Sequence, residues 1–201
     1  ETKPSIKTAT KKPEKTAGKR VTQKNFTAKE AYYTLDEEKF PQLSKLAKNL
    51  TQMAAESKID PLIGRGREIE EIVDILGKRR ANNPLLVGEP GVCKTAIVEG
   101  LANMAYHTPK LVPALDGKVI VELDLHRLFA GTSLRGSLAE RLNGLRDEVK
   151  QAEGKVVVFV DEIHGLSGLG GGDSPEEAAN ALKASLARGE FPCIGATTSD
   201  E

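Results

Sequence analysis

The chain has 201 residues, of which 39% are hydrophobic, and its formal net charge is zero. This length gives room for one domain and an appendage. The longest apolar run, VVVFV at 156–160, is far shorter than the roughly 18 residues that span a bilayer, so no membrane partner is expected. The two cysteines, Cys93 and Cys193, show neither a disulfide framework nor metal-ligand spacing, which indicates a reducing, cytoplasmic compartment.

A basic leader opens the chain. Residues 1–25 contain seven lysines, one arginine and two glutamates, a net charge of +6, so the remainder carries −6. Low hydrophobicity and high net charge predict a disordered segment. The leader contains no aromatic residue on which bases could stack, so we expect no nucleic-acid partner. A nucleic-acid motor or clamp loader stays an alternative that only this charge suggests.

Residues 26–60 are expected to hold a docking segment and an amphipathic helix. The stretch FTAKEAYYTLDEEKFP at 26–41 indicates a short helix or an irregular docking segment. From Gln42 to Ser57 the apolar residues recur with helical spacing, and Asp60-Pro61 follows as a stop signal. A second helix is expected at about 67–80, with its apolar residues on one face.

From residue 85 onward, short apolar runs alternate with amphipathic stretches. Strands are expected at 85–87, 119–123, 155–160 and 191–196, and helices at 94–106, 137–152 and about 174–189. This alternation predicts a domain over 61–201 with a parallel α/β sheet flanked by helices, and with ligands at the carboxyl ends of its strands.

The stretch VGEPGVCKTA at 87–96 nearly matches the phosphate-binding pattern G-x-x-x-x-G-K-[ST]. It lies between an expected strand and an expected helix, where backbone N–H groups and a helix N-terminus bind phosphate. Lys94 would reach the β- and γ-phosphates of ATP, and the Thr95 hydroxyl would bind Mg²⁺. The nucleotide-binding residues predicted here are Gly88, Glu89, Pro90, Gly91, Val92, Cys93, Lys94, Thr95 and Ala96.

The departure from the pattern is Cys93, which stands where the glycine before the lysine is expected. That glycine lets the backbone bring its N–H groups close to phosphate, often at positive φ. A Cβ in that conformation costs about 1–2 kcal/mol. If the strain arises only in the bound state, ATP binding weakens about tenfold. We therefore expect a weakened but real ATP site, with a dead site as the alternative.

A second motif supports the first. In VVVFVDE, Asp161 and Glu162 follow a continuously apolar strand, at the edge of the sheet where the phosphate loop is also expected. In phosphoryl-transfer sites such an aspartate holds the Mg²⁺ shell. The glutamate is then placed to act as the general base that activates water. The alternative is a solvated strand end with no catalytic role.

From about Leu43 to Glu201 the chain resembles the first AAA+ module of Clp-type unfoldases and disaggregases such as ClpA, ClpB and ClpC. The stretches that carry the resemblance are IDPLIGRGREIEEIVDIL, NNPLLVGEPGVCKTAIVEGLA, FVDEIHGL and LKASLARGEFPCIGATTSDE. The resemblance implies the large subdomain of a P-loop NTPase of the AAA+ class, incomplete before its last strand and helical lid. It also implies that Ile63, Gly64 and Arg65 lie beside the adenine and that Thr198 senses the γ-phosphate.

The same resemblance implies a hexameric ring that hydrolyses ATP to thread polypeptide substrates through a pore, with an adaptor or protease as a possible partner. In AGTSLRG, Leu134 stands where the family commonly has a substrate-gripping aromatic, and Arg135 and Gly136 are retained. Two alternatives stay open. One is a nucleotide-binding AAA+ scaffold whose hydrolysis Cys93 impairs, and the other is an ATPase devoted to one client, as in secretion-associated Clp proteins.

Overall fold

The computed structural model describes residues 28–130, 137–166 and 192–199. Five strands form one sheet in the order β1 (Ala47–Asn49), β3 (Val119–Leu123), β4 (Val156–Val160), β5 (Cys193–Thr197) and β2 (Leu85–Val87). Strands β2 to β5 pair in parallel, which confirms the predicted parallel sheet, whereas β1 pairs antiparallel with β3 at one edge.

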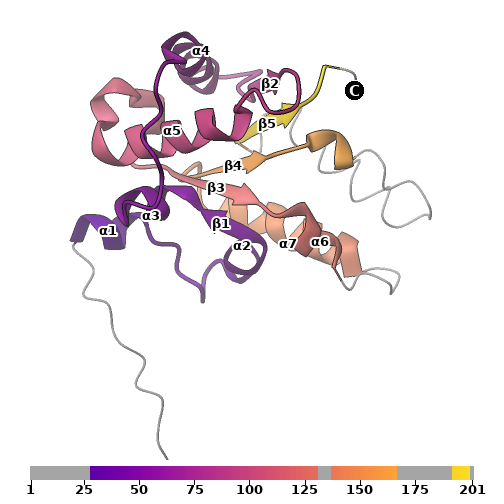
Figure 1. The fold of residues 1–201 in the computed structure, drawn as a ribbon. Helices are drawn as coiled ribbons and strands as arrows, with labels where there is room; N and C mark the ends of the chain where they lie inside the picture. Colours follow the sequence, from indigo (N-terminus) through magenta and orange to yellow (C-terminus); the bar gives the residue numbers. More distant parts are fainter. Residues whose placement is uncertain (1–27, 131–136, 167–191, 200–201) are drawn as a thin grey trace, which may run out of the picture.

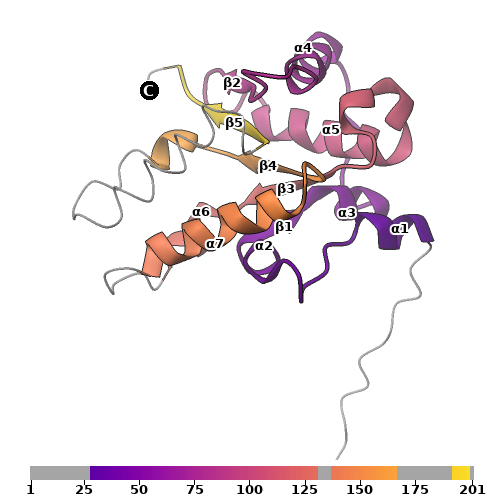
Figure 2. The same cartoon turned by 180° about the vertical axis from the view of Figure 1, so that it is seen from behind.

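Helices cover both faces of the sheet. Figures 1 and 2 show α5 (Lys94–His107) and α7 (Ser137–Gln151) on opposite faces. The other helices in the described residues are α1 (Ala28–Tyr33), α2 (Pro41–Leu46), α3 (Leu50–Ala55), α4 (Gly66–Leu76) and α6 (Leu125–Phe129). Short 3₁₀ turns lie at Pro109–Leu111, Pro113–Leu115 and Ile163–Leu166. In the part of the chain that the structure describes, no helix has the length and apolar character needed to cross a membrane.

The core lies between the sheet and these helices. Every residue of β4 and of β5 is buried, as expected of central parallel strands covered on both faces. Leu43, Leu50 and Leu101 are fully buried in the same cluster. Residues 28–60 therefore share one core with the residues that follow them, while the predicted division of the chain at 60 and 61 stays a prediction.

The single helix predicted from Gln42 to Ser57 is wrong. The structure divides this stretch into α2, β1 and α3, so the backbone is extended where β1 pairs with β3. The Asn49 side chain caps α3 by accepting the Gln52 N–H at 2.9 Å. The helical spacing nevertheless identified buried positions, because Leu43 and Leu50 lie in the core on either side of the break.

The N-terminus of α2 is stabilised by a residue that is distant in sequence. Both carboxylate oxygens of Glu148, in α7, accept backbone N–H groups at 2.8 Å, one from Gln42 and one from Leu43. These N–H groups belong to the first turn of α2 and have no partner within the helix. Only 8% of Glu148 is exposed, so this charge-assisted contact fixes α2 against α7.

The other predicted elements that fall within the described residues agree with the structure to within a few residues. The helix expected at 67–80 is α4 and ends at Leu76, and the helices expected at 94–106 and 137–152 are α5 and α7. The 3₁₀ turns and α6 were not predicted, because each is too short to show a period. The basic leader at 1–25 and the helix expected at 174–189 lie outside the described residues.

Candidate functional site

The two predicted motifs meet at the carboxyl edge of the sheet. Thr95 is in the first turn of α5, which follows β2, and Asp161 follows β4 directly. The Thr95 hydroxyl donates a hydrogen bond of 2.7 Å to Asp161 Oδ2. Since β5 lies between β2 and β4, this contact joins loops from two strands that are not neighbours. Two oxygen groups of the kind that bind Mg²⁺ are thus adjacent.

The loop from Gly88 to Cys93 turns the chain from β2 into α5. The Lys94 ammonium group donates to the carbonyl oxygens of Gly88 at 2.8 Å and of Glu89 at 3.1 Å, so it closes over the loop that precedes it. Gly91 has φ of +80°, and no atom lies within 4 Å of the position that a Cβ would occupy there. Residues 88–93 therefore form a tight turn and residues 94–96 begin the helix that follows it, the geometry that binds phosphate.

Cys93 adopts the left-handed backbone conformation that is expected of the glycine in the phosphate-binding pattern. Its φ is +66° and its ψ is +36°, in the left-handed region, and it is the N-cap residue of α5. Its carbonyl accepts the Ile97 N–H at 3.2 Å, and its Sγ lies 3.7 Å from the Gly91 carbonyl oxygen. The expected positive φ is confirmed. The contacts that fix it lie within the chain, so the strain belongs to the folded loop.

The acid pair has two different environments. Asp161 accepts from Thr95 through Oδ2 and from the Glu162 backbone N–H through Oδ1, at 3.0 Å. Glu162 is exposed, and its φ of +48° is uncommon for a residue with a side chain. Its carbonyl accepts the Gly165 N–H at 2.8 Å. One carboxylate is therefore held beside the phosphate loop, and the other is held by an unusual backbone conformation next to it.

The end of β5 lies between the phosphate loop and the acid pair. The buried Thr197 places its hydroxyl 3.1 Å from His164 Nδ1, just beyond the acid pair. Ser199 donates to the Glu89 carboxylate at 2.8 Å, in the phosphate loop. Thr198 stands between the two in sequence, and its role as γ-phosphate sensor stays a prediction. His164 therefore makes a polar contact at the site, and the contact of Ser199 with Glu89 was not predicted.

The segment predicted to lie beside adenine contacts the phosphate loop through Arg65. The guanidinium group of Arg65 pairs with Glu68 at 2.8 Å and donates to the Val92 carbonyl at 3.4 Å. The hydrogen bond between Arg65 and Glu68 raises the pKa of Arg65 and lowers the pKa of Glu68. Ile63 is 93% exposed and Gly64 has φ of +79°. The contact of Ile63 and Gly64 with adenine stays a prediction.

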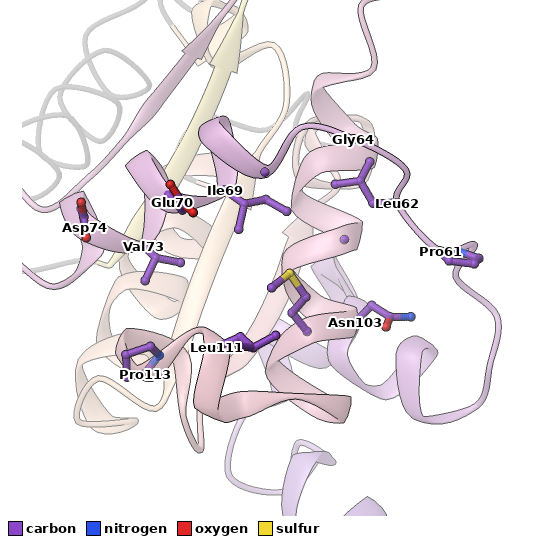
Figure 3. Close-up of a pocket in the computed structure, with 13 residues that line it drawn as sticks. Pro61, Leu62, Gly64, Ile69, Glu70, Val73, Asp74, Asn103, Leu111 and Pro113 are labelled. Carbon is purple, nitrogen blue, oxygen red and sulfur yellow. The ribbon is translucent and has the colours of Figure 1, made fainter.

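A pocket of about 680 Å³ lies between α4, α5 and the segment that precedes α4. Figure 3 shows Ile69 and Val73 on the α4 side of this pocket, Leu62 on the segment that precedes α4, and Leu111 and Pro113 along another wall. Its lining includes Gly64 but no residue of 88–96, so the pocket extends away from the phosphate loop.

Gly100 holds the segment before α4 close to α5, a function that the sequence analysis missed. A Cβ on Gly100 would lie 2.7 Å from Leu62 Cδ2 and 2.8 Å from Leu62 Cβ, both too close for real contacts. The available signal was a glycine in a helix interior, which usually has a packing reason.

The predicted pore residues Leu134, Arg135 and Gly136 lie outside the described residues.

The fold and the site together define a P-loop nucleotide-binding domain, with a phosphate loop and a strand-terminal acid pair at one sheet edge. The family model described as "ATPase family associated with various cellular activities (AAA)" matches residues 84–201, which is more than half of the chain. The chain belongs to this family.

Similar proteins include chaperones of the Clp type. The chloroplast chaperone protein ClpC3 of Oryza sativa is 50% identical over 165 residues, which cover 81% of this chain and 17% of the relative. The chaperone protein ClpB of Corynebacterium diphtheriae is 49% identical over 168 residues, which cover 82% of this chain and 19% of that protein. The predicted resemblance to Clp-type proteins is confirmed, and the chain spans about a fifth of the length of these curated relatives.

Solved structures of yeast Hsp104 have the same fold. The S. cerevisiae Hsp104:casein complex in its extended conformation matches with a TM-score of 0.68 and 40% identity, over 79% of this chain and 27% of that one. The S. cerevisiae Hsp104-ADP complex matches with a TM-score of 0.67 and 43% identity, over 78% of this chain and 21% of that one.

Proposed function

We propose that this chain binds ATP with Mg²⁺ and hydrolyses it. The observation that carries the proposal is the 2.7 Å hydrogen bond between the Thr95 hydroxyl and Asp161, which brings the phosphate loop to the acid pair. An Hsp104 neighbour solved with ADP supports a nucleotide as the ligand. The family to which the chain belongs supports an ATPase as the activity.

The residues at this edge fit both ATP and Mg²⁺. The hydroxyl of Thr95 and the carboxylate of Asp161 are hard oxygen ligands of the type that Mg²⁺ prefers, and together they would hold the ion and its shell. Mg²⁺ supplies charge neutralisation between the β- and γ-phosphates. The Lys94 ammonium and the backbone N–H groups at the start of α5 would bind the phosphate oxygens.

Glu162 would act as general base toward the attacking water. Its carboxylate is exposed beside Asp161, whose own oxygens accept from Thr95 and from the Glu162 backbone. This division of roles leaves Glu162 to take a proton while Asp161 holds its position. Thr198, at the end of β5, would position the same water or sense the γ-phosphate.

At the level of the whole protein, we propose that hydrolysis drives unfolding or disaggregation of polypeptide substrates. The similarity to ClpB and ClpC3 supports this, as does the neighbour solved as an Hsp104:casein complex. A hexameric ring in the cytoplasm, an adaptor or protease partner, and substrate grip by Leu134, Arg135 and Gly136 are further parts of the proposal. An ATPase devoted to one client fits the aliphatic Leu134.

The left-handed conformation of Cys93 favours a second candidate function. Cys93, with φ of +66°, places a Cβ and a sulfur in the turn that must bind phosphate, where glycine would have neither. A ring member that binds nucleotide and assembles without turnover is therefore the alternative. The two candidates differ in whether the intact Asp161–Glu162 pair is used.

The test is nucleotide binding and ATP turnover in the full-length protein that contains this chain. The Glu162→Gln variant should bind ATP as well as the wild type does while hydrolysis falls by about 10²–10⁴, because the amide accepts no proton. The Lys94→Ala variant should lose binding itself. Binding without any turnover in the wild type would select the scaffold, and wild-type turnover in Glu162→Gln would remove the general base from this residue.

A further inference from the structure

The stretch that ends β5 is attached to the site on both sides. On the β4 side, the Thr197 hydroxyl lies 3.1 Å from His164 Nδ1, in the turn that follows the acid pair. On the β2 side, the Ser199 hydroxyl donates to Glu89 Oε1 at 2.8 Å. Because β5 lies between β4 and β2, the two contacts extend in opposite directions along the carboxyl edge of the sheet.

Glu89 is the part of the phosphate loop that this attachment reaches. The backbone carbonyl of Glu89 accepts from the Lys94 ammonium at 3.1 Å and from the Val92 N–H at 3.4 Å. The same residue thus holds the lysine and the turn through its backbone, and Ser199 through its carboxylate. A shift of Ser199 would therefore reach one of the two residues whose carbonyls accept from Lys94, the other being Gly88.

We propose that the Ser199–Glu89 hydrogen bond is a positioning contact for ATP hydrolysis, and that it sets the distance between Thr198 and the phosphate loop. Ser199 follows Thr198 directly, so its attachment to Glu89 leaves Thr198 little freedom along the sheet edge. The inference rests on the proposed function. Ser199 and Glu89 act by positioning Thr198 rather than on the reacting atoms.

The exposure of both partners separates this role from a structural one. Ser199 and Glu89 are both exposed, and such surface contacts contribute little to folding stability. A contact kept only for the fold would leave turnover unchanged when removed. A positioning contact would lower kcat while nucleotide binding and thermal stability stay nearly constant.

The experiment measures ATP turnover, nucleotide affinity and thermal unfolding of the full-length protein. The variants are Ser199→Ala, Glu89→Ala, the double variant and Ser199→Thr, which keeps the hydroxyl. We expect Ser199→Ala to lower kcat about five- to tenfold, the range for one hydrogen bond, with KM within about twofold. Ser199→Thr should restore kcat to within about twofold of the wild type, and the melting temperature should stay within about 1 °C.

The double variant tests whether the two residues act together. If they form one contact, removing both should cost no more than the larger single loss, since the interaction is already absent. Wild-type kcat in Ser199→Ala, or losses that add in the double variant, would overturn the positioning role while ATP hydrolysis stands. If the wild type hydrolyses ATP no faster than Glu162→Gln does, the proposed function and this inference are both overturned.

Discussion

Replacing Cys93 by glycine should stabilise the fold more than it tightens nucleotide binding. The left-handed conformation of Cys93 is fixed by the α5 N-cap hydrogen bond from Ile97 to its carbonyl, so the strain is already present in the folded loop. Strain that is the same with and without nucleotide cancels from the dissociation constant. The condition for a tenfold loss of affinity, strain confined to the bound state, therefore does not hold for this geometry.

The expected change in the free energy of unfolding of Cys93→Gly is the difference between two opposing contributions. Relief of the left-handed strain contributes about 1–2 kcal/mol to the free energy of unfolding. The extra freedom of glycine in the unfolded chain takes back about 0.5–1 kcal/mol. The net gain is about 0–1.5 kcal/mol, and its midpoint of about 0.8 kcal/mol raises the melting temperature of a domain of this size by about 2–3 °C. The dissociation constant for Mg-ATP should change by less than about threefold.

The measurement is thermal unfolding beside nucleotide titration for the wild type, Cys93→Gly and Cys93→Ala. Alanine is the matched control, because it keeps the Cβ and the strain but removes the sulfur. We expect Cys93→Ala to melt close to the wild type and Cys93→Gly to melt higher. Tenfold tighter binding by Cys93→Gly, with an unchanged melting temperature, would refute the reasoning and place the strain in the nucleotide complex.

Three further predictions concern residues around the site. Glu148→Ala should lower the free energy of unfolding in urea by about 2 kcal/mol, because the buried N–H of Leu43 and the partly buried N–H of Gln42 lose their acceptor, and Glu148→Gln, which keeps one acceptor, should cost about half as much. Gly100→Ala should destabilise by about 1–3 kcal/mol through its clash with Leu62, and Leu62→Ala in the same chain should relieve part of that cost. Burial raises the pKa of the Cys193 thiol to about 12, so at pH 8 mass spectrometry should find one alkylated cysteine, Cys93, in the native protein and two after denaturation. Rapid native labelling of Cys193 would contradict its burial.

The sequence predicted the parallel part of the sheet better than its antiparallel edge. Residues 156–160 could be assigned as a strand because a short, continuously apolar run is typical of a central parallel strand covered on both faces. The prediction of a single helix at residues 42–57 was wrong because two short helices joined by a three-residue strand can show the same spacing of apolar residues. What breaks the helix is tertiary: β1 pairs with β3, and the Asp124 N–H donates to the Leu46 carbonyl at 2.9 Å.

The candidate site likewise contains residues that the sequence predicts and one that it does not. Lys94, Thr95, Asp161 and Glu162 were predicted because phosphate and Mg²⁺ chemistry restricts both their type and their spacing. Ser199 could not be predicted, since its role depends on which loop lies beside the end of β5. Such contacts between separate segments leave no periodic signal in the chain.

The sheet order has a consequence for the synthesis of the protein. β5 is the last of the five strands in sequence, yet it lies between β4 and β2 and pairs with both. While a ribosome has yet to release Cys193–Thr197, the half of the sheet with Asp161 and the half with Thr95 have no strand to join them. Nucleotide bound by both halves is therefore expected to stabilise the nascent chain only after β5 has paired with β4 and β2, which is a non-local step.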